Sequence, residues 1–257
     1  DLPAGYADDC HLDFPELDPP GCVYGPDDGA TSVVLLGDSH AQQWLPALEV
    51  LAAERGWRLT AVTKGACPMI DATVWNYPLK RTYRECDEWR ERALELVEQE
   101  AAELVFVASA DMYDVVDEQG TRIEDEAEAE AVWALGLERY LGRLTERTPQ
   151  LVVLADTPRL DYDPAECLAT SAGIEDCVTD RSEMVDDGYA GLEADAVAAV
   201  GADLISATDW LCFEEAGDCP LVRGEYLVFR DRHHLTATFA ARLAERLGAS
   251  IDVVTGR

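Results

Sequence analysis

Residues 32–40 of the chain, SVVLLGDSH, form the stretch that decides the fold. The apolar run 32–36 has the length and composition of a buried strand. A Gly37-Asp38-Ser39 turn ends the run, and a helical pattern begins at Gln42. The Ser39 hydroxyl is therefore expected at the carboxyl end of a strand and beside a helix N-terminus. Ligands bind at that edge of open α/β sheets, and helix amides there can stabilise a developing negative charge.

Strand and helix patterns alternate through the rest of the chain, which predicts a three-layer α/β/α sandwich around a five-stranded parallel sheet. The expected strands are 32–37, 57–62, 104–109, 151–155 and 202–206. The expected helices are about 42–55, 80–101, one that opens in the acidic stretch 117–130 and ends near 147, 183–199 and 236–248. Residues 1–30, rich in Asp, Pro and Gly, are expected to be an irregular, disulfide-pinned lead-in to a domain spanning 31–257.

The composition is strongly acidic, since 52 Asp and Glu against 20 Lys and Arg give a formal net charge of −32. No basic stripe is available to neutralise phosphates, which argues against nucleic acid as a partner and disfavours anionic membranes. The acidic surface is that of a solvated protein or, alternatively, a docking surface for a cationic partner. The apolar runs are too short to span a bilayer. A chain that begins with Asp is expected to be a mature or excised portion.

Eight cysteines fall into four sequence-local pairs, with no Cys-x-x-Cys and no His-x-x-x-His that would indicate a zinc site. Eight cysteines allow 105 pairings, and the short loops favour neighbours. The expected bridges are Cys10–Cys22, Cys67–Cys86, Cys167–Cys177 and Cys212–Cys219. Disulfides indicate an oxidising, extracytoplasmic compartment. The alternative is a cytosolic protein with free buried thiols.

A carboxylate and a histidine near the C-terminus offer what a reactive serine needs. A serine requires an adjacent base, and a histidine base requires a carboxylate to fix its tautomer. Asp231 and His234 are three residues apart, so a single turn can present both to one place. His233 is expected to point away. The pair follows the last expected strand, and a strand order of 2-1-3-4-5 brings it to the same sheet edge as Ser39. A turn serine and a capped surface histidine are the alternatives.

These motifs resemble those of the SGNH hydrolases, over about residues 31–248. More narrowly, the chain is similar to the SGNH domain fused to bacterial acyltransferase-3 membrane proteins. The motifs that carry the narrower resemblance are GDSH at 37–40, KGACP at 64–68, the Cys212…Cys219-Pro pair and FRDRHHLT at 229–236. The resemblance implies a flavodoxin-like sandwich, an acyl-enzyme on Ser39, and O-acylation of a cell-envelope glycan. It also implies a transmembrane acyltransferase-3 domain N-terminal to this domain in the full-length chain.

The oxyanion hole is where the chain departs from the family pattern of a serine amide, a glycine after the second strand and an asparagine after the third. Ser39 and Gly65 match the first two by position, but residues 108–111 read ASAD. Because an ionised Asp111 cannot donate a hydrogen bond, Ser109 is the candidate for the third donor, and a site with only two donors is the alternative.

Four further residues are candidates for substrate binding. They are His40, Trp75, Asp111 and Arg230. His40 lies next to the nucleophile, and Trp75 offers a ring on which a sugar can stack. Arg230 offers a charge for an anionic group. Packing, capping and surface solvation are the alternatives for these side chains, and no metal or organic cofactor is expected.

The sequence therefore predicts a serine-dependent, extracytoplasmic O-acyltransferase that moves an acyl group, expected to be acetyl, from a donor through Ser39 to a carbohydrate or glycolipid hydroxyl. A secreted carbohydrate or acetyl esterase would use the same residues with water as the acceptor. A non-catalytic glycan-binding or scaffold module is the third alternative, which the absent asparagine supports.

Overall fold

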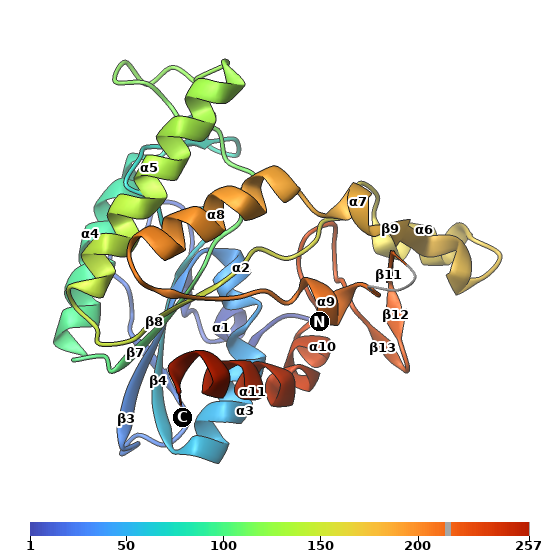
Figure 1. Ribbon diagram of the computed structural model, residues 1–257, viewed down its shortest axis with the longest axis horizontal. Helices are drawn as coiled ribbons and strands as arrows, with labels where there is room; N and C mark the ends of the chain where they lie inside the picture. The colour runs from blue at the N-terminus through green and yellow to red at the C-terminus, as the bar shows by residue number, and fades with distance from the viewer. Residues whose placement is uncertain (214–216, 257) are drawn as a thin grey trace.

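The computed structural model, drawn in Figure 1, describes residues 1–213 and 217–256. The run 32–36 lies inside its sheet, with paired strands on both sides. Strand β3 (Thr31–Gly37) pairs in parallel with β4 (Trp57–Lys64) on one side and with β7 (Leu104–Ala108) on the other. Strands β8 (Leu151–Leu154) and β10 (Asp203–Ile205) continue the sheet beyond β7. The parallel order β4-β3-β7-β8-β10 confirms the predicted order 2-1-3-4-5.

Side chains of β3 alternate between the two faces of the sheet, and both faces are covered by helices. Val33 and Leu35 enter the core under α3 (Leu45–Arg55), α10 (Ala237–Arg242) and α11 (Ala244–Thr255). Val34 and Leu36 enter the opposite core, under α4 (Arg84–Gln99), α5 (Glu126–Thr145) and α8 (Asp187–Ala199). Each of these four strand side chains is fully buried, which stabilises the fold by about 1.5–3 kcal/mol apiece. The three-layer sandwich is thus confirmed (Figure 1).

The lead-in, residues 1–30, is not wholly irregular. It contains α1 (Ala4–Ala7), β1 (His11–Leu12), which pairs in parallel with β4, and β2 (Cys22–Tyr24), which pairs antiparallel with β4. The sheet therefore has seven strands rather than the predicted five. Strands of two and three residues are too short to show a period in the sequence, and they form where the Cys10–Cys22 bridge holds the chain against the edge of β4.

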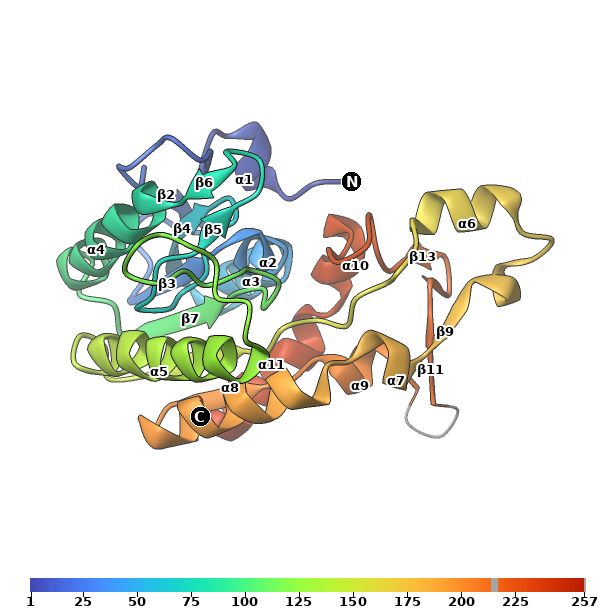
Figure 2. The same cartoon turned by 90° about the horizontal axis from the view of Figure 1, so that it is seen from above.

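Two long connections pack together into a lobe that lies beside the sandwich (Figure 2). We call it the annex, residues 162–184 and 212–227. Strand β9 (Val178–Asp180) pairs antiparallel with β11 (Asp218–Pro220) and thereby joins the two connections. The annex also contains α6 (Pro164–Thr170), the 3-10 helix η1 (Ile174–Cys177), α7 (Arg181–Met184) and the hairpin of β12 (Val222–Arg223) and β13 (Tyr226–Leu227). Residues 214–216 lie outside the described residues.

Several expected boundaries shift by a few residues. The helix expected from 80 begins at Arg84, because the hairpin of β5 (Trp75–Asn76) and β6 (Arg81–Thr82) precedes it. The helix expected at 42–55 is divided into α2 (Ser39–Gln42) and α3, and the one expected at 236–248 into α10 and α11. A short α9 (Thr208–Leu211) follows β10.

The eight cysteines form four disulfides, each between neighbours in sequence. They are Cys10–Cys22, Cys67–Cys86, Cys167–Cys177 and Cys212–Cys219. Two of the four lie in the annex and one closes the lead-in. Among the described residues, no helix combines the length and the apolar character needed to cross a membrane.

Candidate active site

The turn after β3 accepts only glycine at position 37. Gly37 has a φ of +153°, and a Cβ there would clash with the carbonyl oxygen of Ala108 on the neighbouring strand and with the side chain of Ala41. This close approach lets the chain leave the sheet and enter α2 within two residues. Ser39 is consequently the first residue of α2, where the backbone amides of the first turn have no partner within the helix.

Asp38 fixes the conformation of the turn from beneath. Its fully buried carboxylate caps α2 by accepting a hydrogen bond from the amide of His40 at 2.7 Å. It also accepts from the amide of Ala110 at 3.0 Å and from the hydroxyl of Tyr113 at 2.8 Å. Burial raises the pKa of Asp38, while these hydrogen bonds favour its charged form. The role is structural: Asp38 ties the serine turn to the segment that follows β7.

The loop between β13 and α10 brings Asp231 and His234 to Ser39. Asp231 accepts hydrogen bonds from the amides of His233 at 3.0 Å and His234 at 2.9 Å, so its carboxylate closes the turn on itself. The same carboxylate lies 2.9 Å from Nδ1 of His234, and Nε2 of His234 lies 2.8 Å from Oγ of Ser39. The structure therefore aligns the three residues that the sequence singled out, in the order Ser39, His234, Asp231.

The charges around this line keep the carboxylate ionised and the imidazole neutral. Burial alone would raise the pKa of Asp231, but the hydrogen bond and charge of His234 hold it well below its usual range. Burial lowers the pKa of His234; the hydrogen bond that His234 donates to Asp231 acts in the opposite direction, and the charge of His40 lowers the pKa further. A neutral imidazole beside a hydroxyl has the protonation state of a general base.

A second hydrogen-bonded line meets the first, and sequence reasoning missed it. Nδ1 of His40 is hydrogen bonded to the carboxylate of Asp156, and Nε2 of His40 lies 2.9 Å from Nδ1 of His233. The ring of His233 does not point away from His234, as the sequence had suggested; the two ring centroids are 4.1 Å apart. Asp156 follows β8 almost directly, so its position at the carboxyl edge of a parallel strand was the signal available in the sequence.

The structure does not leave the amide of Gly65 free. That amide donates to the carbonyl of Leu12 at 2.8 Å, because β1 continues the sheet beyond β4. The expected oxyanion donor is therefore engaged, and the cause lies in a lead-in strand that the sequence pattern did not predict.

Ser109 follows β7, and its hydroxyl accepts from the amide of Met69 at 2.9 Å. A hydroxyl that accepts one hydrogen bond still has its own proton to donate.

The candidate substrate-binding residues differ in their surroundings. His40 is 1 % exposed and both of its ring nitrogens have partners inside the protein, which favours a packing role over contact with substrate. Trp75 stands in β5, where the guanidinium of Arg122 lies 5.8 Å from its ring centroid. Arg230 donates to Asp231 at 3.2 Å and to the hydroxyl of Tyr6 in the lead-in at 3.3 Å. Arg230 thus helps to hold the carboxylate of Asp231 in place. We call the hydrogen-bonded series Ser39, His234 and Asp231 the Ser39 line.

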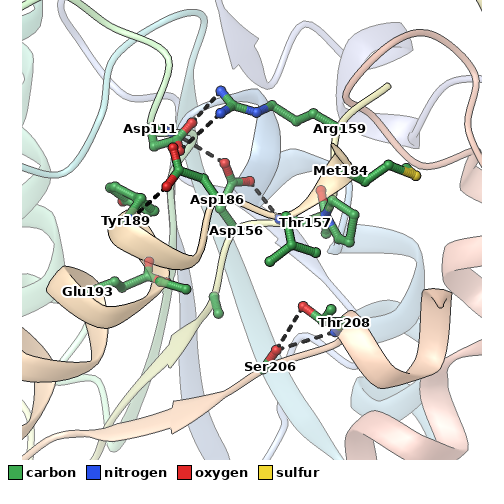
Figure 3. Close-up of a pocket in the computed structure, with 14 residues that line it drawn as sticks. Asp111, Asp156, Thr157, Arg159, Met184, Asp186, Tyr189, Glu193, Ser206 and Thr208 are labelled. Carbon is green, nitrogen blue, oxygen red and sulfur yellow. Dashed lines mark hydrogen bonds and ion pairs between the residues drawn. The ribbon is translucent and has the colours of Figure 1, made fainter. Parts of the chain in front are cut away.

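Asp111 lies between two cavities at the same edge of the sheet. A small cavity of about 50 Å³, drawn in Figure 3, is lined by Asp111, Asp156, Arg159 and Glu193 among others. A larger cavity of about 480 Å³ lies between α5 and α8, with Asp111, Tyr113 and Trp133 in its wall. Asp111 pairs with Arg159 at 2.5 Å, yet burial and the nearby charge of Asp156 raise the pKa of Asp111 to about 6.

Three histidines come close enough to bridge a metal ion. Ring nitrogens of His40, His233 and His234 lie within 4.8 Å of one another. Both nitrogens of His40 and both of His234 already have protein partners. Hydrogen bonds with Asp156, Asp231 and Ser39 therefore account for the cluster without a metal ion.

Comparison with known proteins agrees with this architecture. A structure of the periplasmic domain of a lipopolysaccharide acetyltransferase from Salmonella ser. Paratyphi A matches with a TM-score of 0.62 and 16% identity, covering 88% of this chain and 85% of that one. An acetylxylan esterase from Geobacillus stearothermophilus matches with a TM-score of 0.45 and 11% identity, over 85% of this chain and 93% of that one. An alpha/beta hydrolase from the metagenome of Lake Arreo, Spain, gives 0.48 and 14%, over 86% and 94%.

At these identities the Salmonella domain shows the fold alone, and the other two superpose too loosely to support an argument. None of the curated proteins compared matches the chain. The family model described as "SGNH domain (fused to AT3 domains)" matches residues 9–249, which includes the serine turn, most of the lead-in and the loop with Asp231 and His234. The chain belongs to the family of SGNH domains that are fused to AT3 domains.

Proposed function

We propose that this domain transfers an acyl group through an ester on Ser39 to a carbohydrate hydroxyl outside the cytoplasm. The observation that carries the proposal is the hydrogen-bonded line from Ser39 through His234 to Asp231, set at the first turn of α2. The line supplies a nucleophile, a neutral base and a carboxylate that holds the base in one tautomer.

The reaction proceeds by double displacement. Oγ of Ser39 attacks the carbonyl carbon of the donor ester while Nε2 of His234 takes the hydroxyl proton. The tetrahedral intermediate then expels the donor alkoxide, which receives that proton, and an acyl ester remains on Ser39. An acceptor hydroxyl then gives its proton to His234 and attacks the ester. The bond from the acyl carbon to Oγ of Ser39 breaks, Oγ takes the proton back from His234, and the acylated product leaves. Asp231 stabilises the imidazolium in both halves.

Two donors are proposed for the negative charge of the tetrahedral oxygen. The amide of Ser39 belongs to the first turn of α2, where the helix leaves amides unpaired. The Ser109 hydroxyl stands at the end of β7, next to β3 in the sheet. Loss of one such donor typically raises the barrier by about 3–4 kcal/mol, so a Ser109→Ala change measures whether that hydroxyl takes part.

Two features support the proposed location and partner. Four disulfides are typical of an oxidising, extracytoplasmic compartment. The matching family is described as fused to AT3 domains, which supports a membrane-embedded acyltransferase-3 partner that delivers the acyl group. A cell-envelope glycan or glycolipid is then the acceptor class, with Trp75, Asp111 and Arg230 as candidates for contacting donor or acceptor.

The test is turnover of a small chromogenic acetyl ester together with labelling by a fluorophosphonate. Ser39→Ala and His234→Ala should both abolish turnover. Ser39→Ala should also abolish labelling. Asp231→Asn should retain a small activity, on the order of 10⁻⁴ of the wild-type rate, because the base is still present. Wild-type turnover by Ser39→Ala, with the fold intact by circular dichroism, would overturn the mechanism and favour a non-catalytic module.

An esterase that uses water as its acceptor is the second candidate, because the same three residues perform both reactions. The two are separated by adding a neutral oligosaccharide to the ester reaction and following both acetate and acetylated sugar by mass spectrometry. A transferase diverts acetyl groups to the sugar as the sugar concentration rises, whereas an esterase releases acetate alone.

A further inference from the structure

Asp156, His40 and His233 form a part-buried line that ends beside the Ser39–His234–Asp231 line, and His40 at its centre is fully enclosed. His40 is hydrogen bonded to Asp156 through Nδ1 and lies 2.9 Å from Nδ1 of His233 through Nε2. The ring of His40 lies 4.9 Å from the ring of His234, centroid to centroid, and stacks on His233 at 5.2 Å. The second line thus contacts the proposed base without being part of it.

The hydrogen-bond inventory of this line indicates where its protons lie. The carboxylate of Asp156 also accepts from the amides of Thr157 at 2.7 Å and Asp111 at 3.3 Å, as Figure 3 shows. It can only accept, so Nδ1 of His40 must carry a proton. If Nε2 of His40 is protonated too, it donates to Nδ1 of His233. That bond fixes His233 in its neutral form with the remaining proton on Nε2.

The surroundings of His40 favour the doubly protonated form. The ring is enclosed, and the carboxylates that face it are Asp156, Asp38 and Asp111. Burial alone would lower the pKa of His40, but these three carboxylates, Asp156 above all, raise it above its usual value. His233 shows the converse: burial and the charges of His234 and His40 lower its pKa to about 3.

We propose that His40, which the Asp156 carboxylate holds in its protonated form, is a fixed buried cation that positions charge for the proposed acyl transfer on Ser39. A positive charge beside His234 disfavours a second one, so His234 stays neutral, and able to accept a proton, at a lower pH than an isolated histidine. The same cation lies one residue from Ser39 and favours the negative charge that develops on the tetrahedral oxygen. His40 and Asp156 are positioning residues, since they act on the base His234 from beside it and do not contact the reacting atoms.

Other groups around His234 also affect its protonation equilibrium, which the His40 cation shifts. Asp231 favours a protonated His234, and Arg230 from the same loop disfavours it. From the lead-in, His11 faces the site, but burial lowers its pKa to about 3, so it adds no charge at neutral pH. A conservative substitution of His40 removes its charge but leaves the hydrogen bonds among Ser39, His234 and Asp231 in place.

The test is the pH dependence of kcat/KM for a small acetyl ester in His40→Gln and Asp156→Asn. Removing the cation makes His234 easier to protonate, so the acid limb of the profile should move up by roughly one to two pH units. Asp156→Asn should move it in the same direction, since His40 without its carboxylate becomes neutral. His11→Gln removes a buried but uncharged histidine near the same site and should leave the limb in place.

A uniform loss of rate with an unmoved acid limb in both variants would overturn the proposal, because it is what a packing role alone predicts. If the variants do not fold, nitrogen-15 NMR of the histidines in the wild-type protein decides the point. At pH 7, His40 should be doubly protonated while His233 is neutral. A neutral His40 at pH 7 refutes the proposal. This spectrum, repeated in Ser39→Ala, reports on the cation even if Ser39 proves not to be the nucleophile.

Discussion

At the scale of single residues, the buried carboxyl of Glu193 gives a pH-dependent stability that can be measured. Glu193 is 3 % exposed and faces the small cavity with Asp156 and Asp111; burial, and then the charge of Asp156, raise its pKa well above the usual value. The folded protein therefore binds this proton more tightly than the unfolded chain does. Its stabilising effect is complete below about pH 4 and is lost as pH rises through the folded-state pKa.

Glu193→Gln keeps the shape of the side chain and removes that titration. At pH 8 the variant should be more stable than the wild type by about 1 kcal/mol or more, a rise in Tm of about 2–4 °C, and near pH 4.5 the difference should shrink. Thermal unfolding at both pH values checks this. Glu95→Gln, at an exposed position on α4, is the matched control and should change neither value. Equal Tm differences at the two pH values would mean that Glu193 does not titrate between them.

The residues of the Ser39 line could be predicted because their chemistry is local in sequence. Gly37 to Ser39 is a turn between two strong patterns, and Asp231 and His234 fit within one turn. The second line was missed since Asp156 and His40 are far apart in sequence, and only the order of the strands makes them neighbours. The expectation that Gly65 is an oxyanion donor failed for a similar reason. Its amide donates to the carbonyl of Leu12, which belongs to a two-residue strand with no periodic signal in the sequence.

At the scale of elements, the five parallel strands and the large helices follow apolar patterns that the sequence shows, whereas the lead-in and the annex are held by disulfides and short pairings. The lead-in reaches the site, because Leu12 engages Gly65 and Tyr6 contacts Arg230. The segment that leads into the annex contacts the Asp231 loop, because the amide of Leu160 donates to the carbonyl of Arg232 at 2.7 Å. Disulfide removal can therefore separate what stabilises the fold from what shapes the site.

We expect the double variants Cys10→Ala/Cys22→Ala and Cys167→Ala/Cys177→Ala to lose similar stability but different amounts of activity. The bridges close loops of similar length, with sequence separations of 12 and 10, so each loss should be about 2–3 kcal/mol. Freeing the lead-in should also lower ester turnover by roughly tenfold or more, equivalent to about 1.4 kcal/mol of barrier, while the annex variant should stay near the wild type. Urea unfolding and turnover below the transition check both, and equal activity losses would show that the lead-in has no special part in the site.

At the scale of the whole molecule, the net charge of −32 should discriminate among acyl donors. A surface of this charge repels anionic substrates and leaves neutral ones unaffected. Salt screens that repulsion, since the Debye length falls from about 30 Å at 0.01 M to about 8 Å at 0.15 M ionic strength. For a succinyl ester, whose free carboxylate is negative, kcat/KM should rise severalfold over that range, while for the uncharged acetyl ester of the same alcohol it should stay constant. The matched pair separates long-range repulsion from any effect of salt on the enzyme itself. If the succinyl ester is instead turned over best at low salt, a local cation such as Arg230 outweighs the surrounding acidic surface, and the acyl pocket is built for an anionic group.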